Sequence, residues 1–301
     1  MHTRSLAHHG VGWAVARMDH RPGAVAGRQA LGLVRACHVQ PTLVVTGVAT
    51  GLAVVSGRDA PGCLAVALTV LAGQLATGWS NDWFDAARDR AVGRIDKPIV
   101  AGLVSLATVR TAAVSAAAAA VLLSFLSGWR AALVAMVAGA SALAYNLGLK
   151  ATVISPLPYA VSFGLLPAFV TLGLPEHPWP RPTIMVATAL LGVGAHFINT
   201  LADRNDDERS GIVGLPQRMT ARMALVTGVT LLTLCAVAVW TLGGSGRGAE
   251  SLLLAATLGA SAMVVVSSLR SRPRGAWSWT LVTVVGCLAM FAVSRPPLVG
   301  G

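Results

Sequence analysis

Two short stretches of the sequence contain most of its acidic residues, and both follow one pattern. Eight of the twelve Asp and Glu residues fall within 82–96 and 203–208. The first stretch reads Asn81-x3-Asp85-x3-Asp89-x3-Gly93-x4-Pro98, and the second reads Asn199-x3-Asp203-x3-Asp207-x3-Gly211-x4-Pro216. Five residue types therefore recur at identical spacing, about 118 residues apart. We interpret the two stretches as copies of one internal repeat.

The spacing of four suggests what these side chains do. Residues four apart lie on one face of an α-helix, and like charges at that spacing repel one another. Hard oxygen ligands without His or Cys favour Mg²⁺, which takes one or two carboxylates and fills its shell with water and phosphate oxygens. The sequence therefore predicts two stripes of Mg²⁺ ligands: Asn81, Asp85 and Asp89 in the first, and Asn199, Asp203 and Asp207 in the second.

Basic residues are expected near the same stripes. Arg88, Arg90, Arg94 and Lys97 follow the first stripe, and Arg204, Arg209 and Arg218 accompany the second. Lys150 and Arg35 flank other apolar segments, on what we predict to be the same side of the protein. Together, metal and cations would neutralise a departing diphosphate and favour ionisation of an allylic C–O bond. The combination suits a diphosphate with a lipid tail.

The elements that must position these residues are apolar segments. The chain is 54% hydrophobic and only 12% charged, and segments of roughly 17–25 residues, each long enough to cross a bilayer, recur along it. We predict an all-α integral membrane protein with nine transmembrane helices around a central cavity. The expected spans are 41–57, 62–80, 103–127, 129–149, 153–174, 183–202, 220–242, 249–268 and 276–294.

The acidic stretches follow the second and sixth spans, so we expect two parallel four-helix repeats and a ninth helix. The nine-helix domain is expected over 31–295, preceded by a segment, 1–30, that is mobile or lies on the membrane surface. The alanine-rich run "AAVSAAAAAV" (112–121) is interpreted as close helix packing.

The net charge of +11 is interpreted as a sign of how the protein is oriented in the membrane. No nucleic-acid partner is expected. With the N-terminus in the cytoplasm, 18 of the 23 basic residues fall in cytoplasmic segments, as the positive-inside rule requires. We therefore expect a plasma membrane or equivalent inner membrane protein with its C-terminus outside. Its acidic site would face the cytoplasm.

These residues resemble the UbiA-type intramembrane prenyltransferase family. "NDWFDAARD" (81–89) resembles the family's first motif, NDxxDxxxD, and "DRNDD" (203–207) resembles its second, DxxxD. "YNLGLK" (145–150) is similar to the family's Tyr-x3-Leu-Lys-Arg stretch, although Ala151 replaces the final Arg and Glu208 also stands where the family often has Arg. The resemblance covers about residues 30–295 and agrees with the nine-helix plan.

The resemblance implies a role for each residue of the site. Asn81, Asp85, Asp89, Asp203 and Asp207 are implied to bind Mg²⁺ and the diphosphate, the four aspartates being the catalytic residues. The substrate-binding residues are implied to be Asn81, Asp82, Arg35, Tyr145, Lys150 and Asn199. The central cavity is implied to open sideways to lipid and to hold the isoprenoid tail.

Three functions fit the sequence. The leading one is Mg²⁺-dependent transfer of a prenyl group from a polyprenyl diphosphate to a lipophilic acceptor in the membrane. A terpene cyclase would ionise the same substrate and close the cation on its own chain, helped by aromatic ring faces. A cation or phosphate transporter is a third hypothesis, although transport sites normally lie near the bilayer midplane. The acceptor, the length of the prenyl chain and the oligomeric state are not indicated.

Overall fold

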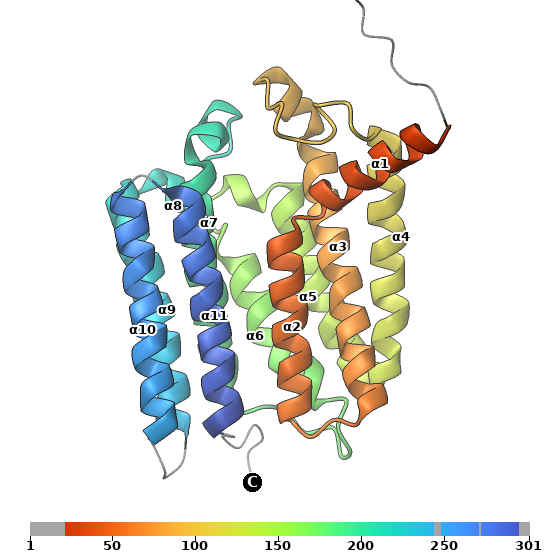
Figure 1. Cartoon of the computed structure of the whole chain (residues 1–301). Helices are drawn as coiled ribbons and strands as arrows, with labels where there is room; N and C mark the ends of the chain where they lie inside the picture. The colour runs from red at the N-terminus through yellow and green to blue at the C-terminus, as the bar shows by residue number, and fades with distance from the viewer. Residues whose placement is uncertain (1–21, 244–247, 271, 295–301) are drawn as a thin grey trace, which may run out of the picture.

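The computed structural model describes residues 22–243, 248–270 and 272–294, which form helices joined by short connections (Figure 1). The helices are α1 (Pro22–Ala36), α2 (Val39–Val55), α3 (Ala60–Ala91), α4 (Leu106–Ser124), α5 (Trp129–Leu147), α6 (Leu157–Thr171), α7 (Pro182–Arg209), α8 (Leu215–Arg218), α9 (Ala221–Leu242), α10 (Gly248–Leu269) and α11 (Pro273–Ser294). Single 3₁₀ turns, η1 (Phe125–Ser127) and η2 (Leu149–Ala151), follow α4 and α5. The expected all-α fold is confirmed.

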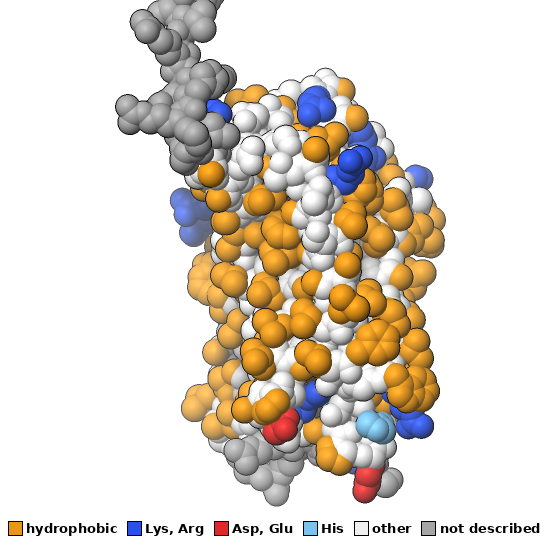
Figure 2. Space-filling model, turned by 90° about the vertical axis from the view of Figure 1, so that its right-hand side faces the viewer, with side chains coloured by type: hydrophobic (Ala, Val, Ile, Leu, Met, Phe, Trp, Pro, Cys, Tyr) orange, Lys and Arg blue, Asp and Glu red, His pale blue; other side chains and the backbone are white. Residues whose placement is uncertain are grey.

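The described helices form a multi-pass membrane protein. Seven of them are long and apolar enough to cross a bilayer, or up to eight if α1 and α2, which meet at a 61° bend, count as one span. The helix α6 is apolar but has 15 residues, so the number nine remains a prediction. Figure 2 shows one face of the molecule, where hydrophobic side chains cover the middle and most Lys and Arg lie near one end.

The long helices close into a ring. Each of α2, α3, α4, α5, α6, α7, α9, α10 and α11 packs against the next, and α11 returns to α2. The two expected four-helix units, α2–α5 and α6–α10, follow each other around this ring, and α11 completes it. The acidic stretches end α3 and α7, the second long helix of each unit. We call this side of the bundle the acidic end.

The glycines of the repeat end these two helices in the same way. Gly93 and Gly211 have φ angles of 71° and 78°, a left-handed conformation that glycine adopts without steric cost. The amide of the next residue then donates to the carbonyl of the last matched aspartate: Arg94 to Asp89 at 2.9 Å, and Ile212 to Asp207 at 2.8 Å. This is the hydrogen bond of a glycine C-cap. The matched glycines therefore turn each loop back immediately after its acidic stripe.

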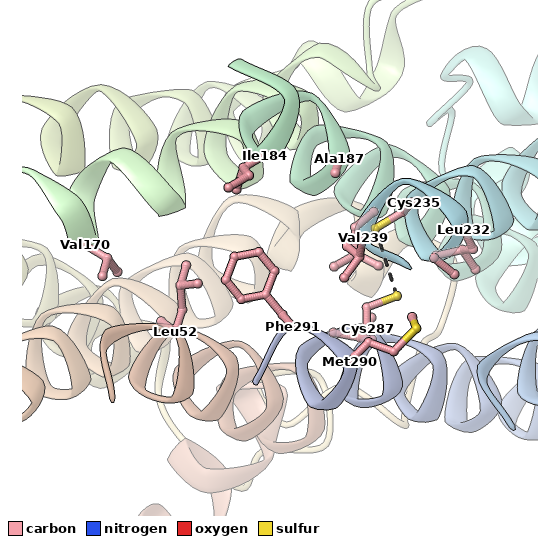
Figure 3. Close-up of a cluster of buried hydrophobic side chains, with 14 of the residues drawn as sticks. Leu52, Val170, Ile184, Ala187, Leu232, Cys235, Val239, Cys287, Met290 and Phe291 are labelled. Atoms are coloured by element: carbon pink, nitrogen blue, oxygen red, sulfur yellow. Dashed lines mark hydrogen bonds between the residues drawn. The ribbon is translucent and has the colours of Figure 1, made fainter. Parts of the chain in front are cut away.

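The main hydrophobic core extends along the bundle and includes the end opposite the acidic stripes. Figure 3 shows Leu52, Val170, Ile184 and Phe291 pointing toward one another from α2, α6, α7 and α11. Each belongs to the last turns of its helix, or to the first turn in the case of Ile184. These four side chains therefore pack the end of the bundle opposite the acidic stripes.

Two helices continue past the predicted membrane spans, as the expected helical stripes require. The second and sixth spans were expected to end at 80 and 202, but α3 continues to Ala91 and α7 to Arg209. The added turns carry the carboxylates of both stripes, which line a cavity, and Asp85 pairs there with Lys150. Most of the predicted N-terminal segment, 1–30, lies outside the described residues, and its described part belongs to α1.

Close contact between α7 and α9 gives a test of the packing. A Cβ atom on Gly194 would lie 2.9 Å from Leu232 Cγ and 3.0 Å from the carbonyl oxygen of Gly228, whereas one on Gly139 would meet nothing within 4 Å. Both substitutions to alanine gain the same helix propensity. We expect Gly194→Ala to be less stable than Gly139→Ala by about 1–3 kcal/mol, the usual cost of overpacking. Thermal unfolding in detergent measures this; equal midpoints would contradict the close packing.

Candidate active site

Both acidic stripes face one cavity of about 450 Å³ at the acidic end. The helices α3 and α7 contribute matching residues, and the loops after α3 and α5 contribute cations. The polar wall contains Asn81, Asp85 and Asp89 from α3, Asn199, Asp203 and Asp207 from α7, together with Arg94, Lys97, Tyr145, Asn146 and Lys150. The structure therefore brings the two predicted stripes together across one cavity.

The first stripe is buried and held by neighbouring cations. Asp85 is 6% exposed and forms ion pairs with Lys150 and Arg88. Burial lowers the pKa of Lys150 below its ordinary value, and Asp85 beside it opposes this shift. Asn81 donates a hydrogen bond of 3.2 Å to the side chain of Asn146. Asp85 is therefore already neutralised by protein cations that a bound phosphate could attract instead.

Side chains that follow the two matched glycines in the chain contact the second stripe. Gln217 donates a hydrogen bond of 2.9 Å to Asp207. Arg94, from the loop after α3, lies 3.6 Å from Asp203 and 2.9 Å from Asp96. Although burial opposes it, the hydrogen bond to Asp96 and the charge of Asp203 raise the pKa of Arg94 above its ordinary value. Arg94 thus links the loop of one repeat to the stripe of the other.

Asp82 has different partners from the rest of its stretch. It is 2% exposed and does not contribute to the cavity wall. Its carboxylate lies 2.8 Å from Lys97 Nζ and 3.3 Å from His38 Nε2, and both partners line the cavity. Burial lowers the pKa of Lys97, but the charge and hydrogen bond of Asp82, together with the charge of Asp89, raise it above its ordinary value. Asp82 therefore fixes two cavity residues in place.

Tyr145 and Arg35 were also predicted to bind substrate, and they lie in different places. Tyr145 lies in the cavity wall and packs edge-on against Tyr159 at 5.2 Å between ring centroids. Arg35 is in the last turn of α1, is exposed, and does not line the cavity. The structure thus places Tyr145 at the site and leaves Arg35 outside it.

The sequence alone did not identify two residues of the site: Asn146, which lines the cavity, and Gln217, which contacts Asp207. Asn146 is 2% exposed and donates to Thr77 O at 2.8 Å and to Ser80 Oγ at 2.9 Å, which joins α5 to α3. Gln217 reaches Asp207 only because the loop turns back after α7. Asn146 adjoins Tyr145, and Gln217 adjoins the matched Pro216, so proximity to the motifs was the one available signal.

The donor set fits a magnesium ion with a phosphate ligand. Within the part of the chain that the structure describes, no three His, Cys, Asp or Glu side chains form a ready metal site. Magnesium requires fewer protein ligands than that, because it keeps waters and takes phosphate oxygens. Carboxylates from α3 and α7 that face one cavity supply the hard oxygen atoms it prefers. The residues therefore fit the ion if a diphosphate completes its shell.

Comparison with known proteins identifies the family. The model of the UbiA prenyltransferase family matches residues 42–293. The chain belongs to this family. A search of curated proteins gave no match.

Solved structures of UbiA homologues share the fold. A UbiA homologue from Aeropyrum pernix K1 is 19% identical, with a TM-score of 0.65 over 84% of this chain and 97% of that one. A UbiA homologue from Archaeoglobus fulgidus bound to GPP and Mg²⁺ is 13% identical, with a TM-score of 0.64 over 86% of this chain and 99% of that one. A digeranylgeranylglyceryl phosphate synthase is 15% identical, with a TM-score of 0.62 over 90% and 99%.

The buried pair of Asp82 and Lys97 should matter for stability. We expect Lys97→Met to destabilise the protein by about 3–5 kcal/mol, because it leaves a buried carboxylate with only His38 nearby. The control is Arg209→Met, which removes a 3.9 Å pair with Asp206 at a 74% exposed arginine and should cost about 0–1 kcal/mol. Denaturation in detergent at neutral pH measures both, and similar losses would contradict the assignment.

The pH dependence of this pair has a defined sign. The pKa of Lys97 is raised in the folded protein, so its stabilisation is complete below the unfolded pKa of about 10.4 and is lost as the pH rises through the folded value. We expect the stability difference between wild type and Lys97→Met to be constant between about pH 6 and about pH 9, which lies below that unfolded pKa. In stronger alkali the difference should shrink, and denaturation across this pH range measures it.

Proposed function

We propose that this protein ionises a polyprenyl diphosphate with the help of Mg²⁺ and transfers the prenyl group to a lipophilic acceptor. The observation that carries the proposal is the single cavity into which both acidic stripes face, with cations beside them. Membership of the UbiA prenyltransferase family supports this function. The A. fulgidus homologue of the same fold, bound to GPP and Mg²⁺, supports the choice of substrate and metal.

The residues that would hold the metal are Asn81, Asp85, Asp89, Asp203 and Asp207. When bound, Mg²⁺ would neutralise the diphosphate and make it a better leaving group. Lys150, Arg94 and Lys97 would then donate to phosphate oxygens, exchanging a carboxylate partner for a phosphate. Asn199 and Tyr145 would line the reacting end of the substrate.

The chemical step follows from this arrangement. The C–O bond to the diphosphate breaks and the pair of electrons leaves with the diphosphate, where the cations of the site stabilise the developing charge. A nucleophilic atom of the acceptor then bonds to the prenyl carbon and loses a proton. The packed core at the opposite end limits access to the cavity from that side. This one-ended arrangement favours an enzyme over a transporter.

The orientation in the membrane belongs to the same proposal. We place the acidic end at the cytoplasmic face because most basic residues lie in the segments on that side. Diphosphate substrates would then approach the acidic stripes from the cytoplasm, while their tails enter from the bilayer.

The aspartates provide the first test. We expect Asp85→Ala and Asp203→Ala each to reduce diphosphate release at least about 100-fold, the scale of losing a group that stabilises transition-state charge. Calorimetry should also show weaker binding of Mg²⁺ with a prenyl diphosphate. Glu176→Gln, which changes an exposed residue in the loop between α6 and α7, is the control and should retain activity. Full activity in both alanine variants would contradict the metal assignment.

A terpene cyclase remains the second candidate, because aromatic rings lie beside the acidic stripes. Tyr159 stacks on Phe163 with an interplanar angle of 8° and on His196 at 4.6 Å between centroids. Such ring faces would stabilise a prenyl cation in either reaction.

The product separates these two functions. We expect purified protein with a prenyl diphosphate, Mg²⁺ and a membrane lipid extract to form a prenylated acceptor, detected by mass spectrometry. Without the extract, only slow release of the linear alcohol is expected. A cyclic hydrocarbon formed without any acceptor would instead establish the cyclase.

A further inference from the structure

The bend between α1 and α2 places a histidine in the wall of the acidic cavity (Figure 1). His38 lies between the two helices and lines that cavity, and its side chain is 43% exposed. Its backbone is left-handed, with a φ of 54°. Residues other than glycine adopt this conformation infrequently, and those that do are concentrated at functional sites. The fold therefore holds an imidazole at the cavity in an uncommon backbone conformation.

The helix α3 is shaped to let this bend approach it. A Cβ atom on Gly78 would lie only 2.6 Å from the carbonyl oxygen of Cys37, so the bend can come this close only to a glycine. Gly78 and Asp82 are four residues apart and share one face of α3. The close approach at Gly78 therefore brings the residue after Cys37, His38, to the carboxylate of Asp82.

Two hydrogen bonds fix the bend on either side of the histidine. Trp79 Nε1 of α3 donates to the carbonyl oxygen of Leu33 at 2.9 Å, which holds the end of α1 against α3. The hydroxyl of Thr42 in α2 donates to the carbonyl oxygen of Cys37 at 2.7 Å. The position of His38 is thus set by contacts with three helices.

The contact with Asp82 assigns a tautomer to the ring. His38 Nε2 lies 3.3 Å from Asp82 Oδ1, and a carboxylate can only accept hydrogen bonds. We therefore assign the proton to Nε2 and the free lone pair to Nδ1. No hydrogen bond to Nδ1 comes from the residues that the structure describes. Because Lys97 already neutralises Asp82 at 2.8 Å, the imidazole can be neutral and free to take up a proton.

We propose that His38 is the base that takes the proton lost when the prenyl group is transferred, with Asp82 orienting its ring. The inference rests on the proposed function, which requires an acceptor whose nucleophilic atom carries a hydrogen. The C–O bond breaks and its electron pair leaves with the diphosphate, while an electron pair of the acceptor forms the bond to the prenyl carbon. The proton of the acceptor passes to Nδ1 and is later released to water.

The other titratable groups of the cavity have different tasks. Its four carboxylates belong to the stripes that would hold Mg²⁺, and its cations, Arg94, Lys97 and Lys150, have no lone pair to offer while charged. His196 is 1% exposed and does not line the cavity. Among the described residues, His38 is therefore the one histidine in the cavity wall, and its charged neighbours are Asp82 of α3 and, across that carboxylate, Lys97.

Two substitutions remove the base in different ways. His38→Gln keeps an amide that can donate to Asp82 but has no basic nitrogen. His38→Gly suits the left-handed backbone and leaves a space the size of the ring. His177→Gln is the matched control, because His177 is also left-handed, with a φ of 51°, but is exposed and does not line the acidic cavity. Unfolding midpoints in detergent show whether each variant folds.

The readout is the ratio of prenylated acceptor to linear alcohol, measured by mass spectrometry. Each protein is given geranyl diphosphate, Mg²⁺ and a membrane lipid extract. Both His38 variants should lower the ratio at least about 100-fold, the lower end of the scale of general base catalysis, and His177→Gln should match wild type. Added imidazole should raise the ratio again in His38→Gly but not in His38→Gln, where the glutamine fills the space. A purely structural loss would give no such rescue.

The outcomes separate the base from the function on which it rests. An unchanged ratio in both folded His38 variants, or a lowered ratio that imidazole does not raise in His38→Gly, would overturn the base and leave the transferase standing. If wild type forms a cyclic hydrocarbon without an acceptor, the transferase proposal fails. A shift from hydrocarbon to alcohol in both variants then keeps His38 as the base, and unchanged hydrocarbon overturns it. If wild type forms neither product, both proposals fail.

Discussion

Carboxylates at the edge of a membrane must be neutralised, and the rest of this structure depends on how that is done. An unpaired charge in a low-dielectric setting is costly, yet Asp82, Asp85 and Asp89 are all at most 6% exposed. Asp85 is balanced by Lys150 from the η2 turn, and Asp82 by Lys97 from the loop after α3. These ion pairs hold the η2 turn and the loop after α3 beside the cavity. The same cations are then available when a charged substrate arrives.

The bundle separates its two tasks along its length. One end is packed by the core around Leu52, Ile184 and Phe291, and it provides the rigidity that positions α3 and α7. A polar cavity lies at the stripes of the other end, and an apolar cavity beside it extends along α4 from Ala113 to Ser124. A substrate with a charged head and an apolar tail matches this division, because each part is transferred to surroundings of its own polarity.

The geometry accounts for the departure of a diphosphate more fully than for the fate of the cation. Ionisation depends on groups that lie at the acidic stripes. The fate of the cation depends on whether an acceptor reaches the prenyl carbon before the chain folds back on itself. The rings of Tyr159 and Phe163 would stabilise a cation in both cases.

The sequence by itself determined the helical membrane fold, the repeat and the stripes, because these depend on local periodicity and composition. Asn81, Asp85 and Asp89 needed only a spacing of four to share a helical face. The tertiary structure alone decided that Asp82 binds Lys97 and leaves the cavity wall, that Arg35 lies outside the site and that Asn146 and Gln217 belong to it. It also showed that alanines of α4 border a cavity. Such facts depend on how distant helices and loops pack together, which no local spacing encodes.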